Sequence, residues 1–228
     1  MIYVLIILMI IIIMITTYYR PKIVGYFGEK KIAALLLMLN KNEYKILHDL
    51  YLKKEDGTTS QIDHLIISLY GIFVIETKNY KGWIFGSEYS KQWTQVIYKH
   101  KSKFYNPIKQ NKGHIYTLKY HLKNYKNIPI KSIIVFSTRA TLKLEGIKSK
   151  VIYSINLIRE IRQYKTPVIN IEELKQLENH IKNICITDKK INKTHIKNIK
   201  HKKENRNNYI CPKCGKKLKK ELGNMVHF

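Results

Sequence analysis

The segment that most constrains the fold is QIDHLIISLYGIFVIETK, residues 61–78, in which two apolar runs flank a Tyr-Gly pair. Glycine tolerates the backbone angles of a tight turn, so Tyr70-Gly71 predicts the turn of an antiparallel hairpin. The near-continuous apolar runs on either side indicate buried strands. A chain of 228 residues, 45% of them hydrophobic, is long enough to bury such a hairpin inside one domain.

Charged side chains interrupt this hairpin at one end. Asp63 lies on the first strand, and Glu76 and Lys78 lie on the second. Residues two apart on a strand face the same way, so Glu76 and Lys78 should project together. A turn at Tyr70-Gly71 brings Asp63 close to Glu76. Two carboxylates and one ammonium group then converge in apolar surroundings, which is costly unless a partner compensates their charge.

A divalent cation is such a partner. Mg²⁺ prefers oxygen ligands and retains several waters, one of which can attack phosphorus while the cation stabilises charge on a phosphate. Mn²⁺ would serve in the same way, with Asp63 and Glu76 as ligands. Lys78 would hold the attacking water, lower its pKa or neutralise developing negative charge. The alternative interpretation is an ordinary Asp–Lys or Glu–Lys ion pair on a half-exposed strand.

The pattern around the hairpin predicts a mixed α/β domain with a mixed central sheet flanked by helices. Expected helices cover residues 25–40, 107–124, 155–164 and 170–185, and further strands cover 44–52, 83–86, 92–98 and 132–137. We expect the catalytic core within residues 25–140, and the rest of the α/β domain within 141–186.

The N-terminal run, residues 1–19, contains no charged side chain. At about 1.5 Å per helical residue it nearly spans a hydrocarbon layer of about 30 Å. It has no small-residue cleavage site of the kind that ends a signal peptide. Arg20 and Lys22 follow it, so the run predicts a single-pass helix in the cell membrane, with the following domain in the cytoplasm. A buried core helix or strand pair is the alternative.

The formal net charge of +26 favours a polyanionic partner, either nucleic acid or an anionic membrane surface. Lysine supplies most of this charge, and only five arginines occur. Abundant Ile, Asn, Lys and Tyr are also expected from AT-rich coding DNA, so the charge permits nucleic-acid binding without establishing it.

The C-terminal region is interpreted as a basic linker, residues 187–208, and a partial zinc-ribbon-like segment, residues 209–228. Its Cys211 and Cys214 form a CxxC pair, which can present two thiolates to one Zn²⁺. A closed site needs four ligands, and a second CxxC does not follow. His227 could be a third ligand, with His201 or Cys185 as a fourth. A truncated ribbon that binds no zinc is the alternative.

Several blocks in the sequence resemble successive blocks of the NERD (nuclease-related) domain. They are GEKKIAALL, SQIDHLIIS, GIFVIETKNYKGWIFG, QW and FYNPIKQNKGHIYTL, in order across residues 25–137. That family is grouped with PD-(D/E)XK nucleases, so the resemblance implies a restriction-endonuclease-like fold and Mg²⁺-dependent hydrolysis of phosphodiester bonds, with DNA as the expected substrate. The resemblance matches Asp63, Glu76 and Lys78 to the D…ExK core. It also matches Glu29 to an acidic residue of the first helix, and Gln110 to a polar residue of a later helix.

Glu29 and Gln110 each have two interpretations. Glu29 could complete the metal site or orient a bound water, or it could simply complement the helix dipole. Gln110 could hydrogen-bond a phosphate or a carboxylate ligand, or it could be an ordinary exposed helix residue. Gln61 and Asn106 lie in matching blocks without an assigned role.

The remaining candidates are also weighed against structural roles. His64 follows Asp63 and is interpreted as a core histidine rather than a ligand. Trp83 and Trp93 could stack on bases, although packing in a sheet is the more common role. Lys81 and Lys109 are candidate phosphate contacts.

Three functions follow from this interpretation. The first is a membrane-anchored, Mg²⁺-dependent nuclease. The second is a nucleic-acid-binding module that keeps the nuclease fold without catalysis. The third is a scaffold whose basic surface meets anionic lipid. The motif residues leave the choice of DNA or RNA, the mode of cleavage and the oligomeric state open.

Overall fold

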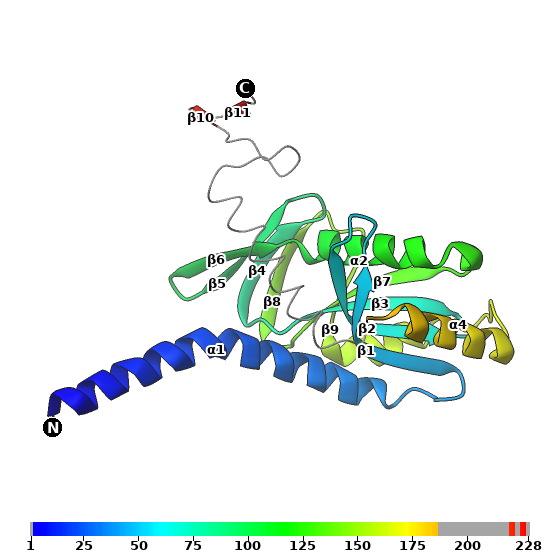
Figure 1. Ribbon diagram of the computed structural model, residues 1–228, viewed down its shortest axis with the longest axis horizontal. Helices are drawn as coiled ribbons and strands as arrows, with labels where there is room; N and C mark the ends of the chain where they lie inside the picture. Colours follow the sequence, from blue (N-terminus) through cyan, green and yellow to red (C-terminus); the bar gives the residue numbers. More distant parts are fainter. Residues whose placement is uncertain (1, 187–218, 222–223, 227–228) are drawn as a thin grey trace.

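A computed structural model of the protein describes residues 2–186, 219–221 and 224–226 (Figure 1). The predicted linker at 187–208 and the candidate zinc ligands Cys211 and Cys214 lie outside the described residues, as do His201 and His227. The described chain forms a mixed α/β fold with two mixed sheets and flanking helices. A short antiparallel pair, β10 (Lys219–Glu221) with β11 (Asn224–Val226), lies beyond the α/β domain in the sequence.

The first sheet has five strands in the order β1-β2-β3-β7-β9. Strand β2 pairs antiparallel with both β1 and β3, whereas β7 pairs parallel with both β3 and β9. Their bounds are Tyr44–Lys53 (β1), Thr59–Ser68 (β2), Gly71–Lys78 (β3), Ile130–Phe136 (β7) and Lys150–Tyr153 (β9). The β2–β3 hairpin turns where the sequence predicts, with Ser68 opposite Gly71 and His64 opposite Ile75. Gly71 has φ 117°, an angle that disfavours residues with a side chain.

Strand β3 is central because both of its faces are covered. Phe73 and Ile75 pack against Ile32 and Leu36 of the helix α1 (Ile2–Leu36). On the other face Val74 belongs to a core with side chains from α2 (Pro107–His121) and α4 (Ile171–Ile184). Successive side chains of β3 therefore point into two different cores. Glu76 and Lys78 lie on the same face of the strand as Val74.

The second sheet has four strands in the order β6-β5-β4-β8, and its bounds are Gly82–Ser87 (β4), Gln92–Ile97 (β5), His100–Tyr105 (β6) and Ala140–Glu145 (β8). Its buried face packs on the first sheet through Trp93, whose ring stacks on Phe136 with centroids 6.0 Å apart. The sequence predicts one central sheet. The structure corrects this prediction, because the four strands β6, β5, β4 and β8 form a second sheet. Strand β6 escapes prediction because its sequence, HKSKFY, is polar and mostly exposed.

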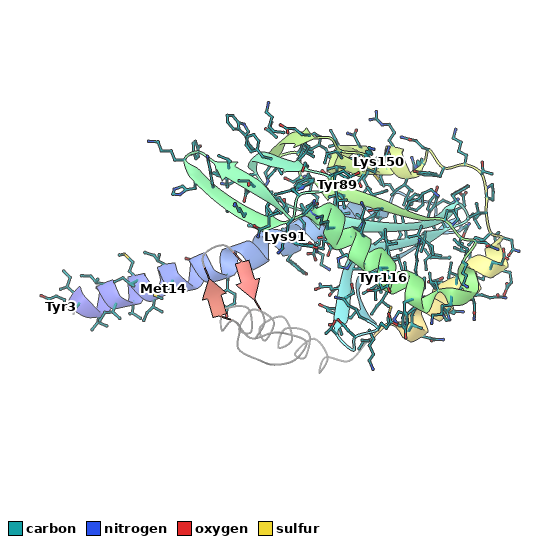
Figure 2. The ribbon with its side chains drawn as sticks, turned by 90° about the horizontal axis from the view of Figure 1, so that it is seen from above. Tyr3, Met14, Tyr89, Lys91, Tyr116 and Lys150 are labelled. Carbon is teal, nitrogen blue, oxygen red and sulfur yellow. The ribbon has the colours of Figure 1, made fainter. Side chains whose placement is uncertain are left out.

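The apolar N-terminal run and the predicted helix at 25–40 form one continuous helix, α1, of 35 residues. Its first part extends beyond the sheets in Figure 1, and Figure 2 shows Tyr3 and Met14 on this projecting part. Side chains Ile2 to Met14 are exposed, whereas Ile32 and Leu36 are buried. Within the described residues, no helix combines the length and apolarity needed to cross a membrane. The predicted transmembrane helix at 1–19 is therefore not supported; its residues begin a helix that continues into the domain core.

The C-terminal part of the domain adds α3 (Leu157–Ile161) and α4 against the first sheet. Two 3-10 turns, Lys123–Tyr125 and Ser154–Asn156, connect α2 to β7 and β9 to α3. Helix α4 begins with a capping box in which Asn170 accepts from the Glu173 N–H and Glu173 accepts from the Asn170 N–H. Leu174, Leu177 and Ile181 then bury one face of α4.

Candidate active site

A cavity of about 750 Å³ lies at the carboxyl end of β3. It is bordered by α1, the start of β2, the β5–β6 hairpin and the start of α2. Its lining includes all five residues predicted for the site, namely Glu29, Asp63, Glu76, Lys78 and Gln110. The fold therefore brings together side chains that are up to 81 positions apart in the sequence (29 to 110).

Glu76 and Lys78 share one face of β3, as the strand periodicity predicts. The Lys78 ammonium nitrogen lies 2.5 Å from Glu76 Oε1 and donates a second bond to Gln110 Oε1 at 3.2 Å. Glu76 is almost fully buried, with 1% of its surface exposed. Lys78 thus links the buried carboxylate of β3 to the first turn of α2, and its head group has a defined position.

Asp63 reaches the same cavity because β2 leaves β3 at this point. The β2–β3 pairing ends at His64 and Ile75, and Asp63 Oδ2 instead accepts the backbone N–H of Thr77 at 2.8 Å. On β1, Asp49 interrupts the pairing with β2 and has φ 53°, an unusual angle for a residue with a side chain. Asp49 Oδ1 accepts from Gln61 Nε2 at 2.7 Å. The β1–β2 pairing is thus interrupted at the same level at which Asp63 leaves its pairing with β3.

Burial and mutual charge set the protonation of the cluster. Burial raises the pKa of Asp63 to about 8, with the neighbouring Glu76 carboxylate adding to the effect. Burial also opposes ionisation of Glu76, but the neighbouring side chains of Lys78 and His114 together outweigh it and hold the pKa of Glu76 below its ordinary value. Burial disfavours the charged form of Lys78, but the interaction with the Glu76 carboxylate outweighs burial. The pKa of Lys78 is therefore raised above its ordinary value. At neutral pH the cluster is an ion pair beside a protonated Asp63.

Glu29 faces this cluster from α1. Burial raises its pKa, and the carboxylates of Asp49 and Glu76 add to the effect. The Glu76 carboxylate therefore contributes to the raised pKa of both Glu29 and Asp63. A cation bound among these groups would lower the pKa values of both side chains.

His114 is a site residue that the sequence analysis missed. It lies on α2 one turn after Gln110, and its Nδ1 is 2.7 Å from Ser60 Oγ. Its Nε2 lies 3.2 Å from Glu76 Oε2, within ion-pair distance but without hydrogen-bond alignment. The spacing of four residues from Gln110 was the available signal, because residues four apart share a helix face.

Two asparagines hold α2 in position. Asn106 caps the helix by accepting from the Ile108 N–H at 2.9 Å, and its amide donates to the carbonyl oxygen of Ser90 at 2.8 Å. Asn111 donates to the Val74 carbonyl oxygen on β3 at 2.8 Å. Asn106, which had no assigned role, is thus a structural residue that fixes where Gln110 and His114 project.

The carboxylate oxygens in the cavity suit a divalent cation that takes few of its ligands from the protein. Asp63 and Glu76 offer carboxylate oxygens, and Glu76 Oε2 is buried without a hydrogen bond in the described structure. Among the described residues, no group of three His, Cys, Asp or Glu side chains converges as a ready ligand set. Mg²⁺ does not need one, because it is usually held by one or two carboxylates and keeps several waters.

Basic side chains border the cavity. Lys81 and Arg139 line it, and Arg139 donates to Asn79 Oδ1 at 2.9 Å. Arg139 and Lys78 also line an adjoining cavity of about 250 Å³, together with Lys31 of α1. Lys109 is absent from the lining of both cavities, and its role as a phosphate contact stays a prediction.

The two tryptophans and His64 have different surroundings. His64 is buried beside His48, with their Nδ1 atoms 2.8 Å apart, and burial lowers its pKa to about 3. This agrees with a core histidine. Trp93 is fully buried, as packing in a sheet requires, whereas 55% of the surface of Trp83 is exposed.

Comparison with known proteins identifies a family. The family model described as the nuclease-related domain, NERD, matches residues 24–137, a span that includes Glu29, Asp63, Glu76, Lys78 and Gln110. An uncharacterized protein of Bacillus anthracis is 37% identical over 185 residues, which cover 80% of this chain and 86% of that relative. No solved structure matches the chain. With half of its residues within that match and a relative of this similarity, the chain belongs to the nuclease-related domain family.

Proposed function

We propose that the protein is a metal-dependent nuclease that hydrolyses phosphodiester bonds in DNA. The observation that carries the proposal is the cavity in which Asp63, Glu76 and the Lys78–Glu76 ion pair meet. Two carboxylates beside a fixed ammonium group suit a reaction in which water attacks a phosphate and negative charge accumulates. The nuclease-related family and the basic rim of the cavity support the same assignment.

In this proposal Asp63 and Glu76 hold Mg²⁺ or Mn²⁺. When bound, the cation supplies an activated water and stabilises charge on the phosphate. Glu76 is already ionised beside Lys78, whereas Asp63 must lose its proton to become a ligand. Glu76 is therefore ready to bind the cation at neutral pH. Binding by Asp63 depends on the pH and on the cation concentration.

Lys78 stabilises negative charge on the scissile phosphate or on the attacking oxygen. Its ammonium group can do this because Gln110 and Glu76 fix it in the cavity. Glu29 has a raised pKa and can accept a proton from a water that faces α1. Gln110 acts through Lys78 and is a positioning residue.

The competing function is a nucleic-acid-binding module without catalysis. The observation that favours it is the Lys78–Glu76 ion pair, in which each buried charge already has a partner. It keeps the basic cavity rim but assigns Asp63, Glu76 and Lys78 to stability. The two functions differ in whether the bound nucleic acid is cleaved.

Association with a membrane is a separate part of the proposal. Residues Ile2 to Met14 expose only apolar side chains, a larger apolar surface than folded proteins usually leave in water. Flotation of the full-length protein with lipid vesicles tests this. Recovery of the protein in the lipid-free fraction would argue against membrane association.

The nuclease proposal is tested by cleavage assays on the full-length protein in a neutral detergent. Linear DNA, circular DNA and RNA are each incubated with Mg²⁺, with Mn²⁺ and with EDTA. The informative variant is Glu76→Ala/Lys78→Ala, because removing both partners of a buried ion pair leaves no unpaired buried charge. Glu178→Ala/Lys182→Ala is the matched control, since it removes an ion pair on α4 outside the cavity.

Metal-dependent cleavage of DNA that the first variant loses and the control retains is the expected result. Cleavage of RNA alone would change the substrate but keep the reaction. Absence of cleavage, with equal DNA binding by the wild type and both variants, would instead support the binding module.

A further inference from the structure

Strand β4 places two large aromatic side chains on the outer face of the second sheet. Trp83 is 55% exposed and Phe85 is 40% exposed, whereas Ile84 between them is fully buried. The two rings lie side by side, with centroids 6.3 Å apart and planes at 80°. A single exposed aromatic residue is common on protein surfaces, but an adjacent pair on an open sheet forms an unusual apolar surface.

The strand register shows which side chains surround this pair. Trp83 lies opposite Val96 of β5, which in turn lies opposite Lys101 of β6. Residues directly opposite each other on neighbouring strands share a face. A lysine therefore ends the row that begins at Trp83.

The second row repeats this arrangement. Phe85 lies opposite Thr94 of β5, which lies opposite Lys103 of β6. On its other side Phe85 lies opposite Lys143 of β8. Lys101, Lys103 and Lys143 are all exposed. We call these five residues the aromatic face: Trp83, Phe85, Lys101, Lys103 and Lys143.

The side chains of the aromatic face favour single-stranded nucleic acid over other partners. Exposed rings flanked by ammonium groups suit single-stranded nucleic acid, whose bases stack on the rings while its phosphates contact lysine. A duplex offers its phosphates but keeps its bases stacked internally. Glu145 is one acidic residue on the same face, one row beyond Lys143, and the chain as a whole carries a net charge of +26. This excess of positive charge favours a polyanion over a protein partner with a neutral or basic surface.

The same hairpin also borders the active-site cavity. Gln95 and Ile97 of β5 and His100 of β6 line the cavity, whereas Thr94 and Val96 belong to the rows of the aromatic face. Successive residues of β5 thus point alternately toward the active-site cavity and toward the aromatic face. A nucleic-acid strand on the aromatic face needs to pass only the β5–β6 hairpin to reach Asp63 and Glu76.

We propose that the aromatic face binds a single-stranded segment of the substrate, with Trp83 and Phe85 stacking on bases and the three lysines contacting phosphates. This inference rests on the proposed nuclease function, because it names the form of nucleic acid that the same enzyme takes. It assigns to Trp83 the stacking role that the sequence left open, and it leaves Trp93 as a packing residue.

Tryptophan fluorescence tests the proposal directly. The chain contains two tryptophans, and Trp93 is fully buried, so Trp83 is the one that a ligand can quench. Full-length protein in a neutral detergent with EDTA, which prevents metal-dependent cleavage, is titrated with a single-stranded oligothymidylate and with a duplex of equal length. We expect quenching by the single strand at concentrations at least about tenfold below those needed for the duplex.

The variant Trp83→Ala/Phe85→Ala should bind the single strand at least about tenfold more weakly in a filter or anisotropy assay. Emission from Trp93 reports whether this variant is folded. Tyr116→Ala is the matched control: it removes a side chain that is 67% exposed on α2, away from the β5–β6 hairpin (Figure 2), and should bind as the wild type does.

Unchanged single-strand affinity in the folded double variant would overturn the inference, and so would equal quenching by the duplex. Loss of binding to anionic lipid vesicles alone, with nucleic-acid binding intact, would reassign the face to a membrane surface. These results are separable from the nuclease proposal. Normal cleavage with normal single-strand binding in the double variant refutes only the aromatic face, whereas absence of cleavage in the wild type refutes only the nuclease.

Discussion

Replacing Asp63 by asparagine should stabilise the metal-free protein, and increasingly so as the pH rises. The folded protein holds the pKa of Asp63 at about 8, mainly through burial, against an ordinary value of 3.8. A folded pKa above the unfolded one means that the folded state keeps a proton which the unfolded chain has lost. Between about pH 4 and pH 8 the free energy of unfolding of the wild type therefore falls as the pH rises. An asparagine side chain cannot ionise, and its amide oxygen can accept the Thr77 N–H as Asp63 does.

The size of the effect follows from the two pKa values. At about 1.4 kcal/mol per pKa unit, the difference between 3.8 and about 8 corresponds to roughly 6 kcal/mol above pH 8. Asp63 borders a cavity that water can enter, so partial screening should reduce this to on the order of 3 kcal/mol. The stability advantage of Asp63→Asn should grow by that amount between about pH 4 and pH 8.

The assay is urea unfolding at several pH values in EDTA, followed by emission from the buried Trp93. Mg²⁺ should reduce the advantage of the variant at high pH, because a cation at the site favours the carboxylate form of Asp63. A difference between the two proteins that stays constant across this pH range would refute the reasoning about Asp63. A pH-dependent difference that Mg²⁺ leaves unchanged would refute its role as a ligand.

Three further substitutions test the packing around the site. Lys78→Met should lower the free energy of unfolding by about 3–5 kcal/mol at pH 7, because it leaves Glu76 buried without its counter-charge; adding Glu76→Gln should restore part of the loss in urea unfolding. His114→Ala should cost about 1–3 kcal/mol by the same measurement, because the buried Glu76 carboxylate loses its neighbour on α2; unchanged stability would contradict the contact. Gly86→Ala should cost about 1–3 kcal/mol, because its Cβ would overlap the buried ring of Trp93; thermal unfolding with no decrease in Tm would exclude this close packing.

The hairpin at the centre of the site was predictable because its signals are local. Turn chemistry at Tyr70-Gly71 and the two-residue period of a strand give the β2–β3 register and the shared face of Glu76 and Lys78. The structure confirms both. Long apolar runs such as those of β3 and β7 are also recognisable without their partners.

The features that could not be predicted from the sequence depend on contacts between distant segments. His114 meets Glu76 only after α2 packs on β3; its spacing from Gln110 indicates a shared helix face but not this contact. The interruption of the β1–β2 pairing at Asp49 coincides with a positive φ inside a strand that is otherwise regular. Strand β9 has only four residues and forms because β7 provides a parallel partner. The exposure of Trp83 likewise depends on which face of the second sheet is covered.

The measurement that tests the central claim most directly is the rate of DNA cleavage by Asp63→Asn in Mg²⁺ at about pH 8. The variant is expected to be at least as stable as the wild type at this pH, so lost activity could not be attributed to unfolding. We predict cleavage by the wild type and a decrease of roughly a hundredfold or more in the variant, because a ligand of the activating cation is removed. Cleavage by the variant at the rate of the wild type would contradict the assignment of this cavity as the active site.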